Sequence, residues 1–159
     1  MDHSAIAEEG LAHLKALLAF DTTNPPGNEL PAARYLEGVL REEGFEPVVI
    51  ESAPGRGNLV TRLQGDGSEP PLLLLNHLDV VPAEEDKWEV APFSADVKDG
   101  YLYGRGAVDM KNMTAMSLMA LLAEKRKGLK LKRDIIFAAV ADEEAGGAQG
   151  AGFLVEHHP

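Results

Sequence analysis

The stretch of sequence that decides the fold, residues 71–79, reads PLLLLNHLD. Its four consecutive leucines, Leu72 to Leu75, leave no polar position for solvent, and this pattern predicts a β-strand buried on both faces. Residues 134–144 read DIIFAAVADEE and repeat the pattern, because an apolar run ends in acidic residues. Two such strands are typical of a parallel or mixed sheet that is covered by helices.

Helical and extended segments alternate around these two strands. Apolar residues at helical spacing predict helices, with Gly44 and Gly128 as stop signals. The predicted helices cover residues 4–18, 30–43, 111–127 and 148–157, and further strands cover residues 45–50, 58–63 and 101–103. This alternation predicts the α/β class, with one domain built on a mixed, largely parallel sheet flanked by helices.

The composition limits the classes of function. The chain has 159 residues, enough for one buried core, and no cysteine, so a transition metal must be bound by histidine and carboxylate groups. A formal net charge of -11, from 15 basic and 26 acidic residues, argues against a nucleic-acid partner. The apolar runs are too short to span a bilayer and the start lacks signal-peptide features, so we expect no membrane partner and a cytoplasmic location.

Histidine and acidic residues follow the predicted strands. His77 and Asp79 come directly after the first apolar strand, and Glu143 and Glu144 follow the second. Asp109 lies between a glycine-containing turn and the next predicted helix. Because ligands of open α/β sheets bind at the carboxyl ends of the strands, we expect these side chains to meet at one edge of the sheet.

The residue types suit a zinc site. Imidazole and carboxylate groups both bind catalytic zinc, which keeps one position open for water. Side chains at i and i+2 of a strand point to the same side, so Asp79 is expected to accept the second N–H of His77 and to fix its tautomer. Asp109 has a short carboxylate that can bridge two cations. Of Glu143 and Glu144, one is expected to bind metal and the other to accept a proton from water.

Each feature has an ordinary explanation when it is taken alone. A His-x-Asp at a strand edge is most often a surface pair, Glu-Glu beside Gly-Gly is usually a solvated turn, and an aspartate before a helix is an ordinary N-cap. The prediction of a metal site therefore rests on the conjunction of the three segments. A doubly wound nucleotide-binding domain is a rival interpretation, but the sequence has no complete phosphate-binding loop.

Four blocks of the sequence carry a resemblance to a known family. They are LNHLDVVP at residues 75–82, the segment 88–93, GRGAVDMK at residues 104–111 and DEEAGG at residues 142–147. In this order and spacing they resemble the signature blocks of the co-catalytic zinc exopeptidases. That family includes aminoacylase, glutamate carboxypeptidase, acetylornithine deacetylase and succinyl-diaminopimelate desuccinylase. The resemblance extends over nearly the whole chain, from the loop FDTTNPPG at residues 20–27 onward.

The resemblance implies a site for two Zn²⁺ ions, which Co²⁺ can replace. By this resemblance His77 would bind one ion, Asp109 would bridge both ions, and Glu144 would bind the second. Glu143 would be the general base, and Asp79 would orient His77. The family also tends to have a cis peptide bond directly after the bridging aspartate.

The resemblance further implies that the site draws on sequence beyond Pro159. The family uses two more metal ligands, a downstream carboxylate and a histidine near the C-terminus, and it inserts a lid domain that often forms a homodimer interface. Residues 1–159 are therefore predicted to be the N-terminal portion of a single metallohydrolase catalytic domain, truncated and without its lid. His157 and His158 are expected to be solvated rather than to replace the further ligands.

The predicted activity is hydrolysis of an amide bond in a small N-acyl amino acid or dipeptide, by water activated between two zinc ions. We expect the 159-residue chain to carry only part of this site and to be inactive by itself. The alternative is a non-catalytic relative that uses the same scaffold for binding or regulation. Turnover of any N-acyl amino acid by the metal-loaded protein would favour the enzyme.

Overall fold

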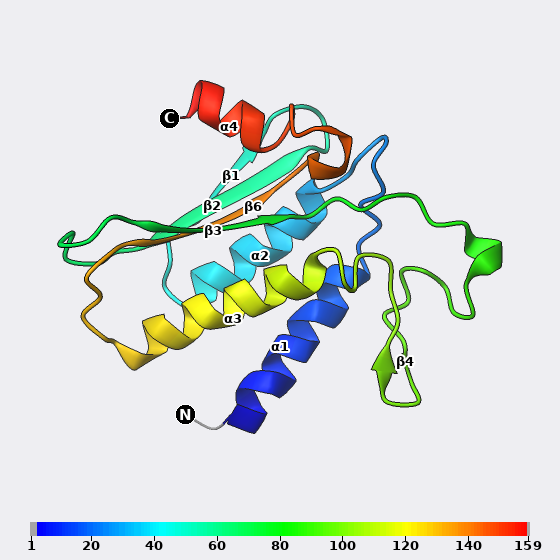
Figure 1. The fold of residues 1–159 in the computed structure, drawn as a ribbon, viewed down its shortest axis with the longest axis horizontal. Coiled ribbons are helices and arrows are strands. Elements are labelled where there is room, and N and C mark those ends of the chain that lie inside the picture. The colour runs from blue at the N-terminus through cyan, green and yellow to red at the C-terminus, as the bar shows by residue number, and fades with distance from the viewer. Residues whose placement is uncertain (1–2, 159) are drawn as a thin grey trace.

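The computed structural model describes residues 3–158. Its centre is a four-stranded sheet with the strand order β1-β2-β6-β3 (Figure 1). A two-stranded sheet, formed by β4 and β5, lies apart from it, within the segment that connects β3 to α3. The strands are β1 (Val48–Glu51), β2 (Gly57–Leu63), β3 (Leu72–His77), β4 (Val97–Lys98), β5 (Tyr101–Leu102) and β6 (Ile135–Val140).

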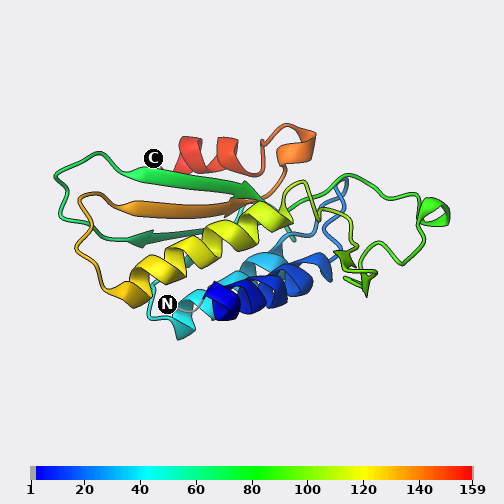
Figure 2. The ribbon, with the colours of Figure 1, turned by 60° about the horizontal axis from the view of Figure 1, so that its bottom comes forward.

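Helices cover both faces of the main sheet. On one face α2 (Leu30–Glu42) and α3 (Lys111–Lys127) pack against the strands, and α1 (His3–Leu18) packs against α3. The short α4 (Ala151–His157) lies on the opposite face (Figure 2). None of the described helices is long and apolar enough to cross a membrane. This arrangement confirms the predicted α/β class, with a mixed sheet flanked by helices.

The main core lies between the sheet and its helices. Leu36 and Leu40, one helical turn apart on α2, and Leu118 on α3 are fully buried together with Phe137 of the central strand β6. Spacing of three to four residues puts such side chains on one face of a helix, and their burial stabilises the fold. Helix α2 has a proline in its first turn. Gly128 follows the last residue of α3 and adopts the left-handed conformation (φ 62°) that is expected of a stop signal.

The register of β3 and β6 decides where a site can form. These strands are parallel, and their register pairs Leu72 with Ile135 and His77 with Val140. Both strands therefore end at the same edge of the sheet, and the residues that follow them leave it side by side. This is the arrangement that the sequence predicts for the two apolar strands.

Parallel pairing is less extensive than predicted. Among the described strands of the main sheet, β3 and β6 are the only parallel pair, whereas β1 with β2 and β2 with β6 are antiparallel. The short connection of residues 52–56 accounts for the first of these pairs, because a short turn can join only antiparallel neighbours.

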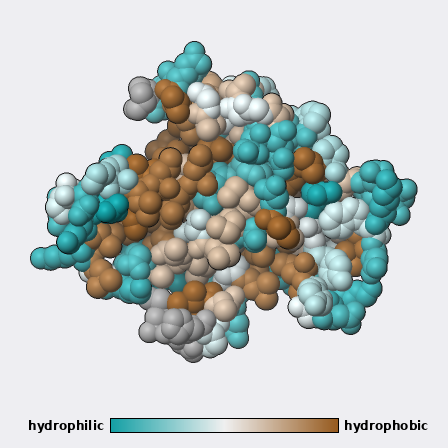
Figure 3. Space-filling model, in the orientation of Figure 1, coloured by the Kyte–Doolittle hydropathy of each residue, from teal (hydrophilic) through white to brown (hydrophobic). Residues whose placement is uncertain are grey.

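The prediction that β3 is buried on both faces is wrong. Leu72, Leu73 and Leu75 are 45%, 53% and 49% exposed. The reason is the position of β3 at the edge of the sheet, where no described strand pairs with its outer side. Figure 3 shows a brown, apolar area on this view of the molecule, and among the described residues several large hydrophobic side chains are exposed. The central strand β6, by contrast, is buried over its second half, as predicted.

Candidate metal centre

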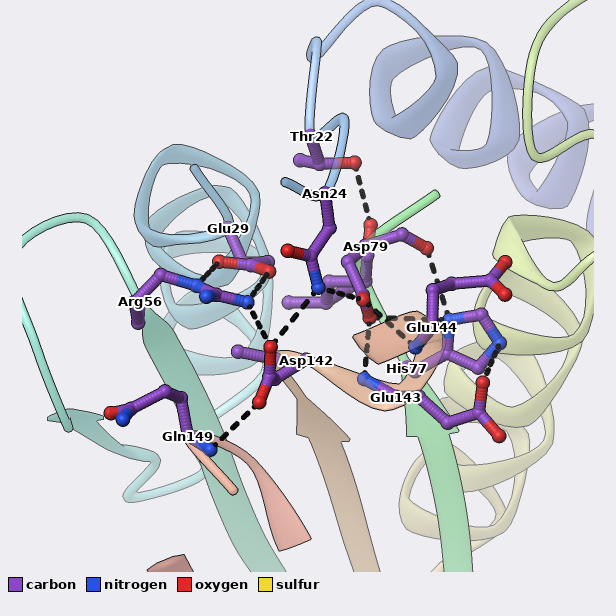
Figure 4. Close-up of polar contacts among 12 residues, drawn as sticks. Thr22, Asn24, Glu29, Arg56, His77, Asp79, Asp142, Glu143, Glu144 and Gln149 are labelled. Carbon is purple, nitrogen blue, oxygen red and sulfur yellow. Dashed lines mark hydrogen bonds and ion pairs between the residues drawn. The ribbon is translucent and has the colours of Figure 1, made fainter. Parts of the chain in front are cut away.

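Three connections bring the predicted site residues together. His77 is the last residue of β3, and Asp79 follows it. Glu143 and Glu144 begin the 3-10 turn η2 (Glu143–Ala145), directly after β6. Asp109 precedes α3, and the peptide bond that follows it is cis, as the resemblance implies. Figure 4 shows the first two segments meeting beside the ends of the parallel strands.

The side chains of His77, Asp109 and Glu144 converge on one point. Each offers one ligand atom, and these atoms all lie within 4.8 Å of one another. The shortest separation, 3.2 Å, joins His77 Nε2 to an oxygen of Asp109. His77 is buried, Glu144 is partly buried and Asp109 is exposed, so the group opens to solvent on one side. One imidazole and two carboxylates form a donor set that zinc accepts, and the geometry therefore fits a divalent metal ion.

His77 is held with Nε2 toward this point. Its Nδ1 lies 3.0 Å from the backbone carbonyl oxygen of Asp79, and because a carbonyl can only accept, Nδ1 carries the proton that is donated. Burial lowers the pKa of His77, but its contacts with Asp79 and the charge of Glu143 outweigh burial and raise the pKa to about 9. His77 must therefore lose its second proton before Nε2 can bind a metal ion.

Asp79 makes a different contact from the one predicted. Its carboxylate is 3.5 Å from His77 Nδ1, farther than its own backbone carbonyl, so the main chain makes the closer contact to the imidazole. The carboxylate instead accepts the backbone N–H groups of Glu143 and Glu144, each at 3.0 Å. Burial raises the pKa of Asp79, but the nearby imidazole of His77 and the hydrogen bonds from Asn24 and η2 outweigh burial and hold the pKa below its usual range. Asp79 thus fixes η2 as well as lying beside His77.

The two glutamates of η2 differ in environment. Glu143 is exposed, and one of its carboxylate oxygens lies 3.8 Å from His77 Nε2. Glu144 is partly buried, and burial together with neighbouring carboxylates raises its pKa despite the attraction of His77. The neighbouring negative charges oppose the ionisation of Glu144, and a bound divalent cation would reduce this repulsion.

A buried polar network beside Asp79 and η2 was not identified from the sequence. It consists of Asn24, Glu29, Arg56 and Asp142, all at most 8% exposed. Asn24 lies in the loop between α1 and α2, and Asp142 is the residue before η2, with a left-handed backbone (φ 69°). The sequence analysis placed Asp142 in a signature block and Asn24 in the loop where the resemblance begins, but no local pattern signals that the two segments meet.

The terminal histidines do not join the group. His157 and His158 are exposed, and their rings lie against Phe153, at centroid distances of 4.4 and 5.9 Å. Within residues 3–158, the group of His77, Asp109 and Glu144 is the one candidate metal cluster. This agrees with the prediction that the terminal histidines are solvated.

The sequence of this chain resembles those of known hydrolases. The model of peptidase family M20/M25/M40 matches residues 73–159. The succinyl-diaminopimelate desuccinylase of Rickettsia typhi is 33% identical over 149 residues, which cover 91% of this chain and 38% of that protein. The aminoacylase-1B of Rattus norvegicus is 37% identical over 145 residues, which cover 89% of this chain and 35% of that protein.

A solved structure supports the fold. Human carnosine dipeptidase 1 aligns with a TM-score of 0.79 at 24% sequence identity, over 96% of this chain and 36% of that one. The chain thus spans little more than a third of the length of these three relatives.

Proposed function

Because the chain belongs to peptidase family M20/M25/M40, we propose that it carries part of a metal-dependent hydrolase that cleaves an amide bond in a small N-acyl amino acid or dipeptide. Two relatives support this substrate class by their names, a desuccinylase and an aminoacylase. The single observation that carries the proposal is the convergence of His77, Asp109 and Glu144 within 4.8 Å of one another.

We propose a site for two zinc ions. The three ligand atoms all lie within 4.8 Å of one another, which is compatible with a pair of ions that share one carboxylate. Paired ions lie about 3.5–4 Å apart. The exposed carboxylate of Asp109, which lies 3.2 Å from His77 Nε2, would bridge the two ions. His77 would then hold one ion and Glu144 the other.

The zinc ions, when bound, would polarise the substrate carbonyl and lower the pKa of water. Glu143 is proposed to take a proton from the attacking water and to pass it to the leaving amine, because its carboxylate is exposed and lies 3.8 Å from His77 Nε2. Asp79 is proposed to orient His77, mainly through its backbone carbonyl, and to hold η2 through its carboxylate.

The proposal is tested by hydrolysis of a panel of N-acyl amino acids and dipeptides by the complete protein. We expect turnover that a chelator abolishes and added zinc restores. His77→Ala should abolish both zinc binding and turnover, whereas His157→Ala, a matched change at an exposed histidine outside the metal group, should alter neither. Turnover that survives removal of all metal, or an active His77→Ala variant, would contradict the proposal.

A further inference from the structure

We propose that Asn24 is a positioning residue for the pair Glu143 and Glu144, because its side-chain amide joins the two buried carboxylates that hold the turn η2. This role rests on the proposed function, since it concerns the residues to which metal binding and proton transfer are assigned. Asn24 itself touches neither the proposed metal ligands nor Glu143 through its side chain, so it would act through Asp79 and Asp142.

The loop that contains Asn24 is fixed to the chain segment after β3. Thr23 and Val80 form a parallel bridge, in which the Asn24 N–H donates to the Val80 carbonyl at 2.9 Å and the Val80 N–H donates to the Thr22 carbonyl at 3.1 Å. The Thr22 hydroxyl also donates to the Leu78 carbonyl at 2.7 Å. This short ladder sets Asn24 in register with Asp79, although the two residues are far apart in sequence.

The Asn24 amide then uses both of its N–H groups. Its Nδ2 donates to a carboxylate oxygen of Asp79 at 2.8 Å and to one of Asp142 at 3.1 Å (Figure 4). Asn24 is 4% exposed, Asp142 5% and Asp79 fully buried, so water is not available to replace these bonds. A buried carboxylate without its hydrogen bonds is costly, and Asn24 serves two of them at once.

Both carboxylates hold η2, but through different amides. Asp79 accepts the N–H groups of Glu143 and Glu144, as described above. Asp142 precedes the turn, and its carboxylate accepts the Gln149 N–H at 3.0 Å, which closes the loop after η2. The orientation of η2 relative to β3 therefore depends on the distance between the two carboxylates, which Asn24 spans.

The far end of the network is anchored by Arg56. Its guanidinium donates to both oxygens of Glu29 at 2.8 Å, and also to the Asp142 oxygen that Asn24 contacts, at 2.9 Å. Arg56 thereby compensates the charges of Glu29 and Asp142 but does not reach Asp79. A neutral double donor is needed between Asp142 and Asp79, and asparagine supplies two donors from one short side chain.

The role is tested by hydrogen exchange of individual backbone amides, measured by NMR in the metal-free 159-residue chain. In Asn24→Ala, exchange of the Glu143 and Glu144 amides should be about tenfold faster, while amides of β6 change less than about twofold. Asn28→Ala is the matched control, because Asn28 is exposed in the same loop and makes none of the network's hydrogen bonds. It should leave all these rates unchanged.

Unchanged exchange at Glu143 and Glu144 in Asn24→Ala would overturn the proposal. An equal rise at all amides would also overturn it, because Asn24 would then stabilise the fold in general. Should Asn24→Ala fail to fold, Asn24→Ser decides, since serine keeps one O–H donor. Its rise in exchange should be smaller and confined to the same two amides, and a uniform rise would again refute the role.

Zinc titration of the same variants by calorimetry separates this role from the proposed function. Asn24→Ala should weaken zinc binding by about tenfold, the lower end of the range for residues that support metal ligands, and Asn28→Ala should not. A wild-type chain that binds no zinc would count against the proposed metal site. The amide measurement would still decide the role of Asn24, because it is made without metal.

Discussion

Replacing Asp79 with asparagine, which keeps the shape of the side chain and removes its charge, should destabilise the chain by about 3 kcal/mol. Asp79 is fully buried and accepts three hydrogen bonds, from the backbone of Glu143 and of Glu144 and from the side chain of Asn24. One carboxylate oxygen takes two of these bonds and the other takes one. The loss of stability depends on how many of these three hydrogen bonds the amide group of asparagine can still accept.

In its best orientation the new amide keeps its oxygen at the position that accepts from Asn24 Nδ2 and the Glu144 N–H. Its NH₂ group then faces the Glu143 N–H, so this hydrogen bond is lost. A bond to a charged group contributes about 1.5–3 kcal/mol, and the two remaining bonds weaken toward the neutral value of about 0.5–1.5 kcal/mol. Together these losses amount to about 3 kcal/mol.

The substitution also removes a buried charge, and this removal offsets part of the lost hydrogen-bond energy. Burial of Asp79 alone would favour the neutral form, but the pKa of Asp79 is held below its usual range, so its surroundings as a whole stabilise the charged form. The loss of hydrogen bonds therefore outweighs the removal of the buried charge, and the net effect is destabilising.

The assay is urea unfolding of both chains at neutral pH. Asp96→Asn makes the same chemical change at an exposed site and should alter the free energy of unfolding by less than about 0.5 kcal/mol. An Asp79→Asn variant that is as stable as this control would refute the reasoning, because the buried carboxylate would then contribute nothing net.

In the complete enzyme Glu143→Gln should retain metal and lose about 10²–10⁴-fold in turnover; near-normal turnover would show that another group accepts the proton. The 159-residue chain with added zinc or cobalt should not turn over N-acyl amino acids, because the described cluster offers three protein ligands for two proposed ions; activity that Glu143→Gln abolishes would contradict this. Hydrogen bonds from Arg126 outweigh burial and lower the pKa values of Glu9 and Glu43, so wild-type stability should fall as the pH drops through these lowered values. In Arg126→Gln the thermal unfolding temperature should fall less between neutral and acidic pH than in the wild type. An equal fall would refute the role of Arg126 in this pH dependence.

The fold was predictable where the sequence signal is local. Helix α3 begins at Lys111 and ends at Lys127, as its apolar spacing and Gly128 predict. Helix α4 begins later than predicted, at Ala151, because Gly146 and Gly147 both have positive φ and extend the turn. The exposure of β3 was not predictable, because an apolar run does not reveal whether a strand has a neighbour on each side.

The candidate site was predictable to the extent that strand ends determine it. The parallel register of β3 and β6 brings His77 and Glu144 together, whereas Asp109 comes from the segment before α3. The roles of these residues remain predictions. The sequence did not identify Asn24 and Arg56, because their contacts with Asp142 join segments that are distant in sequence. Neither residue type is unusual in a loop or beside a strand.

The central claim is that His77, Asp109 and Glu144 hold metal, and anomalous diffraction at the zinc edge tests it most directly. Crystals of the chain grown with zinc should show anomalous density within about 2.0–2.2 Å of His77 Nε2 and of carboxylate oxygens of Asp109 and Glu144. A zinc peak elsewhere, with no anomalous density between these three side chains, would contradict the account.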